Sequence, residues 1–331
     1  MLRAVSEALP RTELHVVSLN DGPIEASAAL RGRVHFTGVG PRSKRVYRPR
    51  MLVSALRAGL RARPDLIVTG HINIVPFTEL LAVITGTPNM MVAHGIEAWA
   101  PPRRLQRVAQ GVTKVLAVSR YTADRLKAWG IADDRITVLP NMVDGEVFRP
   151  IRHDRTSSDV TVLTVARLDA TERYKGVEQV MNALHNVAPE KSIRYVVAGT
   201  GDDLPRLREV AMTSGLGNRV EFRGFVPAID LPSLYSGADV FVMPSKKEGF
   251  GIVFLEALAC GTPVVGGDQD GSIDALMNGK WGHLVDPDST DDILAAILDN
   301  ALPRPDRKAL LDAYGPQRFR SKVHEVLTSA I

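Results

Sequence analysis

The sequence predicts an α/β protein made of two domains, each built on a parallel β-sheet with crossover helices. Its 331 residues are long for one domain and sufficient for two of about 150 residues each. Short β-branched runs alternate with helical stretches throughout, which is typical of parallel sheets. A turn-rich polar segment, residues 140–158, separates the two halves. We therefore expect two Rossmann-like domains facing each other across a cleft.

In the first half, the alternation predicts six short strands with helices between them. The strands are expected at residues 14–19, 34–36, 66–69, 89–93, 115–118 and 136–139. The helical stretches are expected at residues 54–61, 78–84 and 121–129. These elements make up a first domain of residues 1–145, followed by a linker at 146–158.

The second half, residues 159–312, repeats this pattern. Its strands are expected at residues 160–166, 193–198, 220–222, 240–243, 263–265 and 282–285. Its helices are expected at residues 177–185, 204–214, 229–236 and 251–259. Ligands of such sheets bind beyond the carboxyl ends of the strands, so the polar residues that follow each strand are the candidates for function.

Composition excludes several classes of protein. No window holds the roughly 20 apolar residues of a membrane-spanning helix, and the start lacks the pattern of a secretory signal. The single cysteine, Cys260, excludes a disulfide framework and a cysteine-built zinc site, and its apolar neighbours predict a small buried side chain. We expect a soluble, cytoplasmic protein.

Positive charge is concentrated in one block. Residues 31–63 hold ten Lys and Arg and no Asp or Glu, although the net charge of the chain is only +4. Such a basic block attracts lipid headgroups, nucleic acid or a phosphorylated acceptor, unless it is simply a solvated loop and helix face. Nucleic acid is disfavoured because Phe36 and Tyr47 are the only aromatic residues in the block, which matches no reader motif.

The strongest cluster of candidate residues is 244–257, where a strand is followed by the start of a helix. Gly249 and Gly251 expose backbone N–H groups there, and a helix N-terminus favours an anion. Glu248 precedes the helix at the expected ligand, whereas Glu256 lies two turns in and reaches only an outlying ligand group. The alternative is that Glu248 is merely a charge at the helix start and that Glu256 lies on a solvated helix face. The apolar neighbours of Glu256 disfavour this alternative for that residue.

A second cluster follows the first strand of the second half. Arg167 ends that strand and Lys175 precedes the next helix. A guanidinium and an ammonium beside a helix N-terminus suit a diphosphate. Either cation alone would more often belong to a surface ion pair, but together with the Gly-rich helix start they favour phosphate binding.

Weaker signals have structural alternatives. Gly199 and Gly201 indicate a turn that could border a nucleotide, and the Asp pairs at 268–270 and 286–288 indicate turns. His94 follows a strand, and a structural role or a sugar contact are about equally favoured. The sequence shows no His, Cys and carboxylate cluster for a metal and no Ser-His-Asp arrangement.

These motifs resemble those of the retaining family 4 glycosyltransferases of the two-domain GT-B fold. The resemblance rests on Glu248 to Glu256 with its Gly-Phe-Gly, together with the upstream Arg167 and Lys175. It continues through residues 259–265, 118–120 and 140–144 and covers nearly the whole chain.

The resemblance implies a role for each candidate. Arg167 and Lys175 would hold the donor diphosphate and stabilise the charge that grows on it. Glu248 and the backbone of Gly249, Phe250 and Gly251 would orient the sugar and contact the distal phosphate. Glu256 would contact the ribose, and His94 would contact the sugar from the opposite domain. The base would lie along Arg223, Phe225 and Val226. No metal, other cofactor or protein nucleophile is implied.

Two departures from the family pattern are expected to matter. The family normally opens with a strand and a Gly-rich loop, whereas here the first twelve residues resemble the tail of the first helix and 14–19 the second strand. Either the given start is short or part of the site is missing. Residues 266–274 replace the usual Gly-Gly-x-x-Glu. Residues 313–331 are expected to form the helix that returns to the first domain.

The predicted function is retaining, metal-independent transfer of a hexosyl group. The donor would be a UDP-sugar or GDP-mannose, and the acceptor a glycolipid, a lipid-linked sugar or a polysaccharide of the cell envelope. A non-catalytic nucleotide-sugar-binding or partner subunit is the alternative, and a phosphorylase is disfavoured because no lysine is placed to hold pyridoxal phosphate. The basic block would dock the enzyme either on an anionic membrane, as a peripheral protein at its inner face, or on a lipid-pyrophosphate acceptor.

Overall fold

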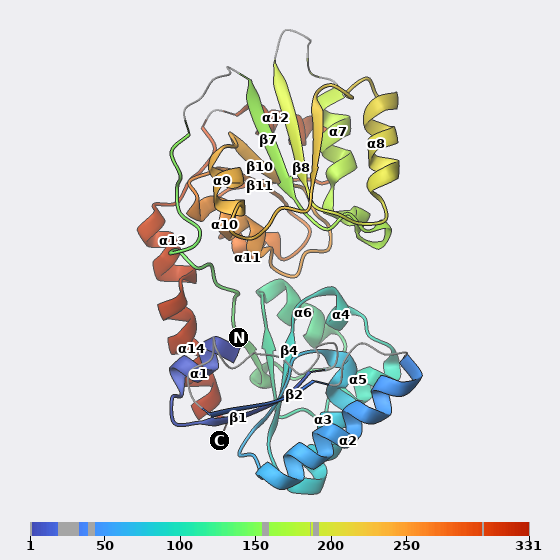
Figure 1. Ribbon diagram of the computed structural model, residues 1–331, viewed down its shortest axis with the longest axis vertical. Coiled ribbons are helices and arrows are strands. Elements are labelled where there is room, and N and C mark those ends of the chain that lie inside the picture. The colour runs from blue at the N-terminus through green and yellow to red at the C-terminus, as the bar shows by residue number, and fades with distance from the viewer. Residues whose placement is uncertain are drawn as a thin grey trace. The chain divides into compact units, whose positions relative to one another are not determined.

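A computed structural model describes residues 2–18, 33–38, 44–153, 159–185, 187, 192–299 and 301–330 (Figure 1). The chain divides into two compact units. Unit 1 comprises residues 1–118, 122–139 and 317–331, and unit 2 comprises residues 119–121 and 140–316. Each unit is described by itself.

Unit 2 contains one sheet of six parallel strands. In spatial order they are β12 (His283–Val285), β11 (Val264–Gly267), β10 (Val240–Met243), β7 (Val160–Val165), β8 (Ile193–Ala198) and β9 (Val220–Gly224). The six strands predicted for this half are all present, with ends that differ by one or two residues. The runs of Val and Ile suit strands that helices cover on both faces.

The order of these strands reverses in the middle of the sheet. The chain builds β7, β8 and β9 outward in one direction, then returns to add β10, β11 and β12 on the other side of β7. The segments that follow β7 and β10 therefore leave the sheet side by side at its carboxyl edge. Ligands of open α/β sheets bind at such a reversal point.

Helices cover both faces of this sheet. One face carries α7 (Val177–His185), α8 (Leu204–Thr213) and α12 (Thr290–Leu298), whose apolar side chains join the strands in a single core. The aromatic ring of Phe241 on β10 packs against Tyr235 and Phe254, which belong to α9 (Leu231–Ser236) and α10 (Ile252–Ala259). The predicted burial of Cys260, directly after α10, is confirmed, since it is 3% exposed.

The described residues of unit 1 form two sheets. Four parallel strands follow chain order, β3 (Ile67–Thr69), β4 (Asn89–Ala93), β5 (Lys114–Ala117) and β6 (Ile136–Val138). The pair β1 (Glu13–Ser18) and β2 (Arg33–Gly38) forms a separate parallel sheet. The helices are α1 (Leu2–Ala8), α2 (Lys44–Ala62), α3 (Val75–Thr85), α4 (Ile96–Trp99), α5 (Arg103–Ala109) and α6 (Arg120–Ala128).

The chain ends with a helix that belongs to the core of unit 1. After α11 (Ser272–Ala275) and α13 (Arg307–Tyr314), α14 (Pro316–Thr328) packs Val323, Val326 and Leu327 against strands β4 and β5. Arg320 of α14 also donates to Glu7 of α1 at 2.7 Å. The last helix therefore supplies apolar surface that covers one face of the four-stranded sheet.

The basic block falls partly outside the described residues, which exclude Arg31 and Arg42 and the side chains of Arg33, Lys44, Arg45 and Arg48. The four arginines whose side chains are described lie on or just after α2 and are exposed: Arg50, Arg57, Arg61 and Arg63. No helix within the described residues is both long and apolar enough to cross a membrane.

We expect Leu327→Ala to destabilise unit 1, because the Leu327 side chain is 4% exposed and completes the core between α14 and the sheet. Truncating a buried leucine lowers the free energy of unfolding by about 2–5 kcal/mol. Urea unfolding followed by circular dichroism measures the change. Glu325→Ala, an exposed position on the same helix, is the control and should stay within about 0.5 kcal/mol. Equal stability of the two variants would contradict this role of α14.

Candidate functional site

The candidate site of unit 2 begins with the segment that follows β7. Arg167 is exposed and pairs with Glu172, a half-buried carboxylate in a 3₁₀ turn at Ala170–Lys175. Gly176 then takes a left-handed φ of 83° and lets the chain enter α7. A side chain at this position would also collide with Pro244, so glycine is required where the segments after β7 and β10 meet.

Lys175 lies between two carboxylates at this meeting point. Its Nζ is 3.1 Å from Glu248 Oε2 and 3.7 Å from Glu172 Oε2. Glu172 Oε2 is buried and accepts no hydrogen bond from any described residue. Two cations and two carboxylates therefore form one connected group, which brings together the predicted residues Arg167, Lys175 and Glu248.

The third cation of this segment has a different function. Arg173 donates through Nε to Asp203 Oδ1 at 3.1 Å, and Arg206 holds the same carboxylate through both of its oxygens. Asp203 is buried, and its hydrogen bonds from Arg206 and Arg173 hold its pKa below the ordinary value. These bonds fasten the loop after β8 to the turn that carries Arg167 and Lys175.

Gly199 and Gly201 are placed by packing. A Cβ on Gly199 would collide with the Ala166 carbonyl, and one on Gly201 with the Leu168 carbonyl. Leu168 N donates to Thr200 O at 2.9 Å, and Asp203 N donates to Leu168 O at 2.9 Å. The two glycines thus allow the loop after β8 to lie directly against the Arg167 segment, whether or not they also contact a ligand.

The Gly-rich segment after β10 enters α10 through a strained backbone. Gly251 takes φ 87° and ψ 71° immediately before the helix, a conformation that residues with side chains rarely adopt. Gly249 is buried, and the Phe250 side chain is 1% exposed and packs edge-on against Tyr314. Phe250 can therefore meet a ligand only through its backbone.

A buried carboxylate within the predicted turn at 268–270 fixes this segment. Asp270 is fully buried, and its Oδ2 accepts from Ser245 Oγ at 2.5 Å and from the Glu248 backbone N–H at 2.6 Å. Its Oδ1 accepts from Ser272 N at 2.9 Å. Asp270 therefore sets the direction of the backbone that carries Glu248.

Glycine makes this contact possible. Gly271 N donates to Glu248 O at 2.8 Å, and any side chain at Gly271 would collide with Gly249 O. A Cβ added to Gly267 would likewise collide with Ser245 O, at 2.0 Å. The sequence signal for this contact was the pattern of glycines around Asp270 in residues 266–274. Glycines that flank an acidic residue after a buried strand allow another backbone segment to approach closely.

Glu256 lies half-buried on α10. The Tyr235 hydroxyl donates to its Oε2 at 2.8 Å, and burial raises the pKa of the Glu256 carboxyl. The alternative of a solvated face is therefore wrong for this residue. The hydrogen bond from Tyr235 holds the carboxylate in one orientation. A carboxylate that binds a ligand hydroxyl needs such a defined orientation.

The predicted base-binding residues lie at the end of β9. Phe225 is 76% exposed, an unusual position for a large aromatic ring, and Val226 is half-buried. Arg223 is exposed and pairs with Glu221 at 2.5 Å. Gly199 N donates to Gly224 O at 2.8 Å, so this segment is tied to the loop after β8.

His94 belongs to unit 1. It is exposed at the carboxyl end of β4, its Nε2 lies 3.1 Å from Gly70 O, and its backbone N–H donates to Glu97 at 2.6 Å. These contacts hold the imidazole at the edge of the four-stranded sheet. Its proposed contact with the sugar remains a prediction.

The comparisons with known proteins identify the family. The profile described as glycosyl transferases group 1 matches residues 150–318, and that described as glycosyltransferase family 4 matches residues 1–147. This chain belongs to the group 1 glycosyl transferases. Its segments after β7 and β10 lie within the first of these matches.

Two curated relatives illustrate the family. The GDP-mannose-dependent alpha-(1-6)-phosphatidylinositol monomannoside mannosyltransferase of Mycobacterium tuberculosis is 33% identical over 228 residues, 64% of this chain and 58% of that protein. The D-inositol 3-phosphate glycosyltransferase of Paenarthrobacter aurescens is 33% identical over 280 residues, 78% of this chain and 68% of that protein. The match with the mannosyltransferase thus spans less than two thirds of its length.

Solved structures share the fold. Anabaena HepE in complex with UDP and glucose superposes with a TM-score of 0.78 at 19% identity, over 99% of this chain and 95% of that one. The sucrose-phosphate synthase of Thermosynechococcus elongatus gives a TM-score of 0.78 at 20% identity, over 99% and 92%. The predicted GT-B fold is confirmed.

We expect the stability contributed by Asp270 to depend on pH. Burial raises the pKa of Asp270 to about 6, so folding favours its protonated form. The contribution is complete below its ordinary pKa of 3.8 and is lost as the pH rises through about 6. Asp270→Asn removes this titration, so the stability of the wild type relative to the variant should fall by about 2 kcal/mol between pH 4.5 and 7.5.

Chemical unfolding of both proteins at the two pH values measures the difference. Asp312→Asn removes an exposed carboxyl (67%) and is the control for the loss of one negative charge. A difference between the wild type and Asp270→Asn that stays constant with pH would contradict the assignment.

Proposed function

We propose that this chain transfers a hexosyl group from a nucleotide-diphosphate sugar, a UDP-sugar or GDP-mannose, to a glycolipid, lipid-linked or polysaccharide acceptor. Family membership supports the reaction class, and the activities of the mannosyltransferase and inositol phosphate relatives support these donors and acceptors. The observation that carries the proposal is the group formed by Arg167, Lys175, Glu172 and Glu248 at the reversal point of the unit 2 sheet.

The charges of this group suit a donor diphosphate. Glu172 and Glu248 hold the two cations close together, and the pairs are only partly shielded from water, since Arg167 is 73% exposed. The Arg167–Glu172 pair is open to water on the arginine side and therefore weak, so a diphosphate can replace Glu172 as the partner of Arg167 at small cost. The Lys175–Glu248 pair is more shielded, at 15% and 21% exposure, and exchanging Glu248 for a diphosphate keeps an anion beside the ammonium. Arg167 would then bind phosphate through its planar fork and Lys175 as a point charge.

The proposed reaction breaks the bond between the anomeric carbon and the distal phosphate oxygen and forms one to the acceptor oxygen on the same face. Because the acceptor attacks from that same face, the configuration is retained, and the acceptor proton passes to the departing phosphate. Arg167 and Lys175 stabilise the negative charge that develops on the leaving diphosphate, the part that a metal plays in other transferases. Glu248 is freed from Lys175 to accept hydrogen bonds from sugar hydroxyls.

The remaining contacts of the donor are proposed from the sequence resemblance. Glu256, oriented by Tyr235, would accept from ribose hydroxyls. The exposed ring of Phe225 offers a flat apolar surface for the base, with Arg223 and Val226 beside it. His94 would supply a contact to the sugar from unit 1.

Calorimetric titration of the chain with UDP and with GDP, in excess chelator, tests the donor site. We expect one of them to bind, and Lys175→Ala to weaken that binding at least tenfold, because a half-buried cation would be lost from the diphosphate. With donor and acceptor supplied, the same variant should lower kcat by about 10²–10³-fold. Lys308→Ala, an 82% exposed lysine of unit 2, is the control and should leave both unchanged.

Unchanged affinity in Lys175→Ala and Arg167→Ala would reject this diphosphate site. Binding or turnover that requires added Mg²⁺ would contradict the metal-independent mechanism. An inverted product anomer, observed by NMR of the glycoside, would contradict retention.

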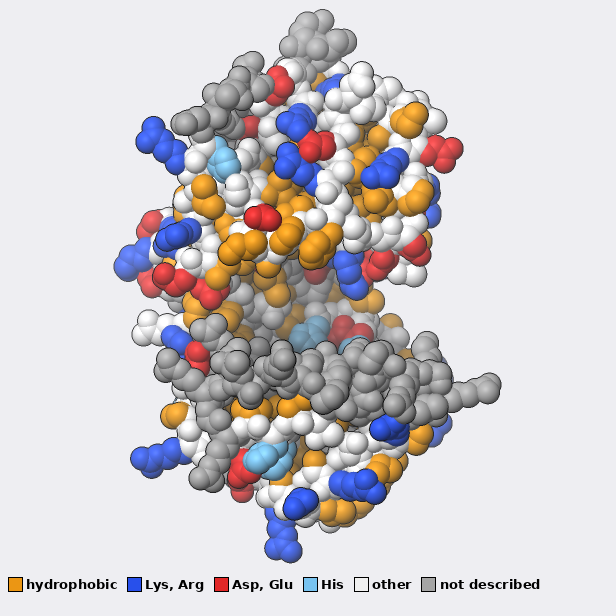
Figure 2. Space-filling view, viewed as in Figure 1, with side chains coloured by type: hydrophobic (Ala, Val, Ile, Leu, Met, Phe, Trp, Pro, Cys, Tyr) orange, Lys and Arg blue, Asp and Glu red, His pale blue; other side chains and the backbone are white. Residues whose placement is uncertain are grey.

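We also propose that the α2 and α3 surface of unit 1 docks on anionic membrane. Exposed apolar side chains lie on both helices, led by Leu60 at 54% and Val83 at 73% exposure, and Arg57 and Arg61 lie among them on α2. Figure 2 shows basic side chains interspersed with hydrophobic ones over this part of unit 1. Arginines beside exposed apolar groups suit the boundary between headgroups and acyl chains.

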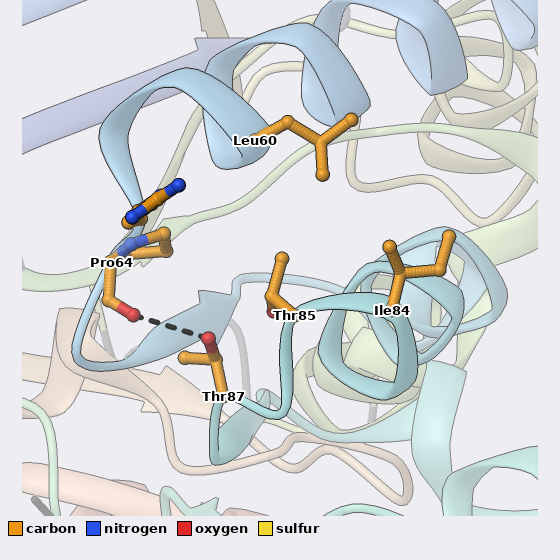
Figure 3. Close-up of a pocket in the computed structure, with 6 residues that line it drawn as sticks. Leu60, Pro64, Ile84, Thr85 and Thr87 are labelled. Atoms are coloured by element: carbon orange, nitrogen blue, oxygen red, sulfur yellow. Dashed lines mark hydrogen bonds between the residues drawn. The ribbon is translucent and has the colours of Figure 1, made fainter.

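An open groove of about 470 Å³ lies at the ends of these two helices (Figure 3). Leu60 from α2 and Ile84 from α3 line it together with Arg63. The Thr87 hydroxyl donates to Pro64 O at 3.2 Å and joins the two segments at its base. The groove offers apolar contact for a lipid beside a cation for its headgroup.

Sedimentation with vesicles of phosphatidylglycerol and phosphatidylcholine tests the docking surface. The variant Arg57→Ala/Arg61→Ala should partition at least about tenfold more weakly, since each arginine near an anionic surface contributes about 1 kcal/mol. Salt should weaken wild-type binding as well. The paired control, Arg208→Ala/Lys308→Ala, removes two exposed cations of unit 2. Binding that is insensitive to salt, or equal on neutral vesicles, would contradict the proposal.

A further inference from the structure

The two-stranded sheet of unit 1 presents three potential metal ligands on one face. Along β1 the side chains alternate, with Glu13 and His15 exposed and Leu14 and Val16 turned inward. On β2, His35 is exposed in the same way and pairs in register with His15. Parallel pairing therefore places Glu13, His15 and His35 together, although the two histidines are far apart in the sequence (Figure 1).

The three side chains converge on one point. The Nε2 atom of His15 lies 3.3 Å from Glu13 Oε1, and that of His35 lies 2.7 Å from the same oxygen. The two imidazole rings stack with centroids 4.7 Å apart and planes inclined by 15°. The three ligand atoms all lie within 4.8 Å of one another. In Figure 2, histidine and acidic side chains lie together at the surface over β1 and β2.

We propose that Glu13, His15 and His35 bind a divalent cation of the zinc class. Two imidazole nitrogens and one carboxylate oxygen form a ligand set that zinc accepts at about 2.0–2.2 Å per bond, with water in the fourth position. Tetrahedral bonds of that length separate neighbouring ligand atoms by about 3.4 Å. The distance from His15 to Glu13 already fits, and that from His35 to Glu13 needs to open by several tenths of an ångström. One imidazole must also rotate out of the stack, because a ring nitrogen binds a metal in the plane of its ring.

The consequence of binding is a clip between the two strands. A sheet of only two strands is marginally stable by itself, and β1 and β2 pair with no other strand among the described residues. A cation held by one residue of β2 and two of β1 stabilises the paired form, since it binds the folded arrangement and not the separated strands. The site lies outside the residues proposed for donor binding, so it is independent of the proposed function.

The competing explanation is an ion pair of protonated histidine with Glu13. Such an ion pair explains the distances equally well, but it predicts no binding of one metal ion per chain. A spectroscopic probe of coordination separates the two, because tetrahedral Co²⁺ bound by nitrogen and oxygen absorbs visible light far more strongly than hydrated Co²⁺.

The experiment is titration of the untagged, chelator-treated full chain with Co²⁺, followed by displacement with Zn²⁺. We expect one equivalent of Co²⁺ to develop the absorption bands and one of Zn²⁺ to abolish them. His15→Ala, His35→Ala and Glu13→Gln should each weaken binding by about tenfold or more. His324→Ala, an exposed histidine of α14, is the matched control and should bind like the wild type.

Zn²⁺ should also raise the thermal unfolding temperature of the wild type and of His324→Ala by a few °C, and leave that of His35→Ala unchanged. Folding of each variant is checked by its circular dichroism in chelator. Absence of the cobalt bands in the folded wild type would overturn the proposal, as would bands of equal strength and affinity in His15→Ala and His35→Ala.

Discussion

The reversal of strand order between β7 and β10 is the constraint on which the candidate site depends. Because the chain returns to the middle of the sheet, the segments after these two strands leave its carboxyl edge next to each other. Arg167 and Lys175 follow one strand and Glu248 follows the other, and Lys175 Nζ reaches Glu248 Oε2 at 3.1 Å. Neither segment alone assembles this charged group, and a different strand order would separate its members.

Close backbone packing keeps these segments in place. Gly199 and Gly201 admit the loop after β8 against the Arg167 segment, and Gly271 admits the 266–274 stretch against Gly249. Two buried carboxylates, Asp203 and Asp270, then form hydrogen bonds between the segments that these glycines allow to pack closely. Asp203 does so through two arginines at the surface, and Asp270 through hydrogen bonds in the interior. Burial raises the pKa of Asp270, because the charged form is destabilised in the interior. The hydrogen bonds of Asp270 nevertheless hold the Glu248 backbone in one direction.

Phe250 and Asp270 show how local reading of a motif can misplace emphasis. Phe250 lies in the centre of the Gly-Phe-Gly motif, yet its ring packs against Tyr314 in the core. Asp270 resembles a turn residue, yet it is fully buried and holds the Glu248 backbone. Motif position and sequence polarity report neither the direction of a side chain nor its distant partners. Those depend on which segments the sheet brings into contact.

The sequence by itself determined the two α/β halves, the twelve strands to within two residues at either end, and the candidates Arg167, Lys175, Glu248 and Glu256. It could do so because hydrophobic alternation and glycine-rich helix starts are local signals. Only the tertiary structure decided that Lys175 lies between Glu172 and Glu248 and that Tyr235 orients Glu256. It also brought His15 and His35 together, where no metal cluster was visible in the sequence. The reason is physical: contacts between distant residues are set by strand order and register, which the pattern along one strand does not encode.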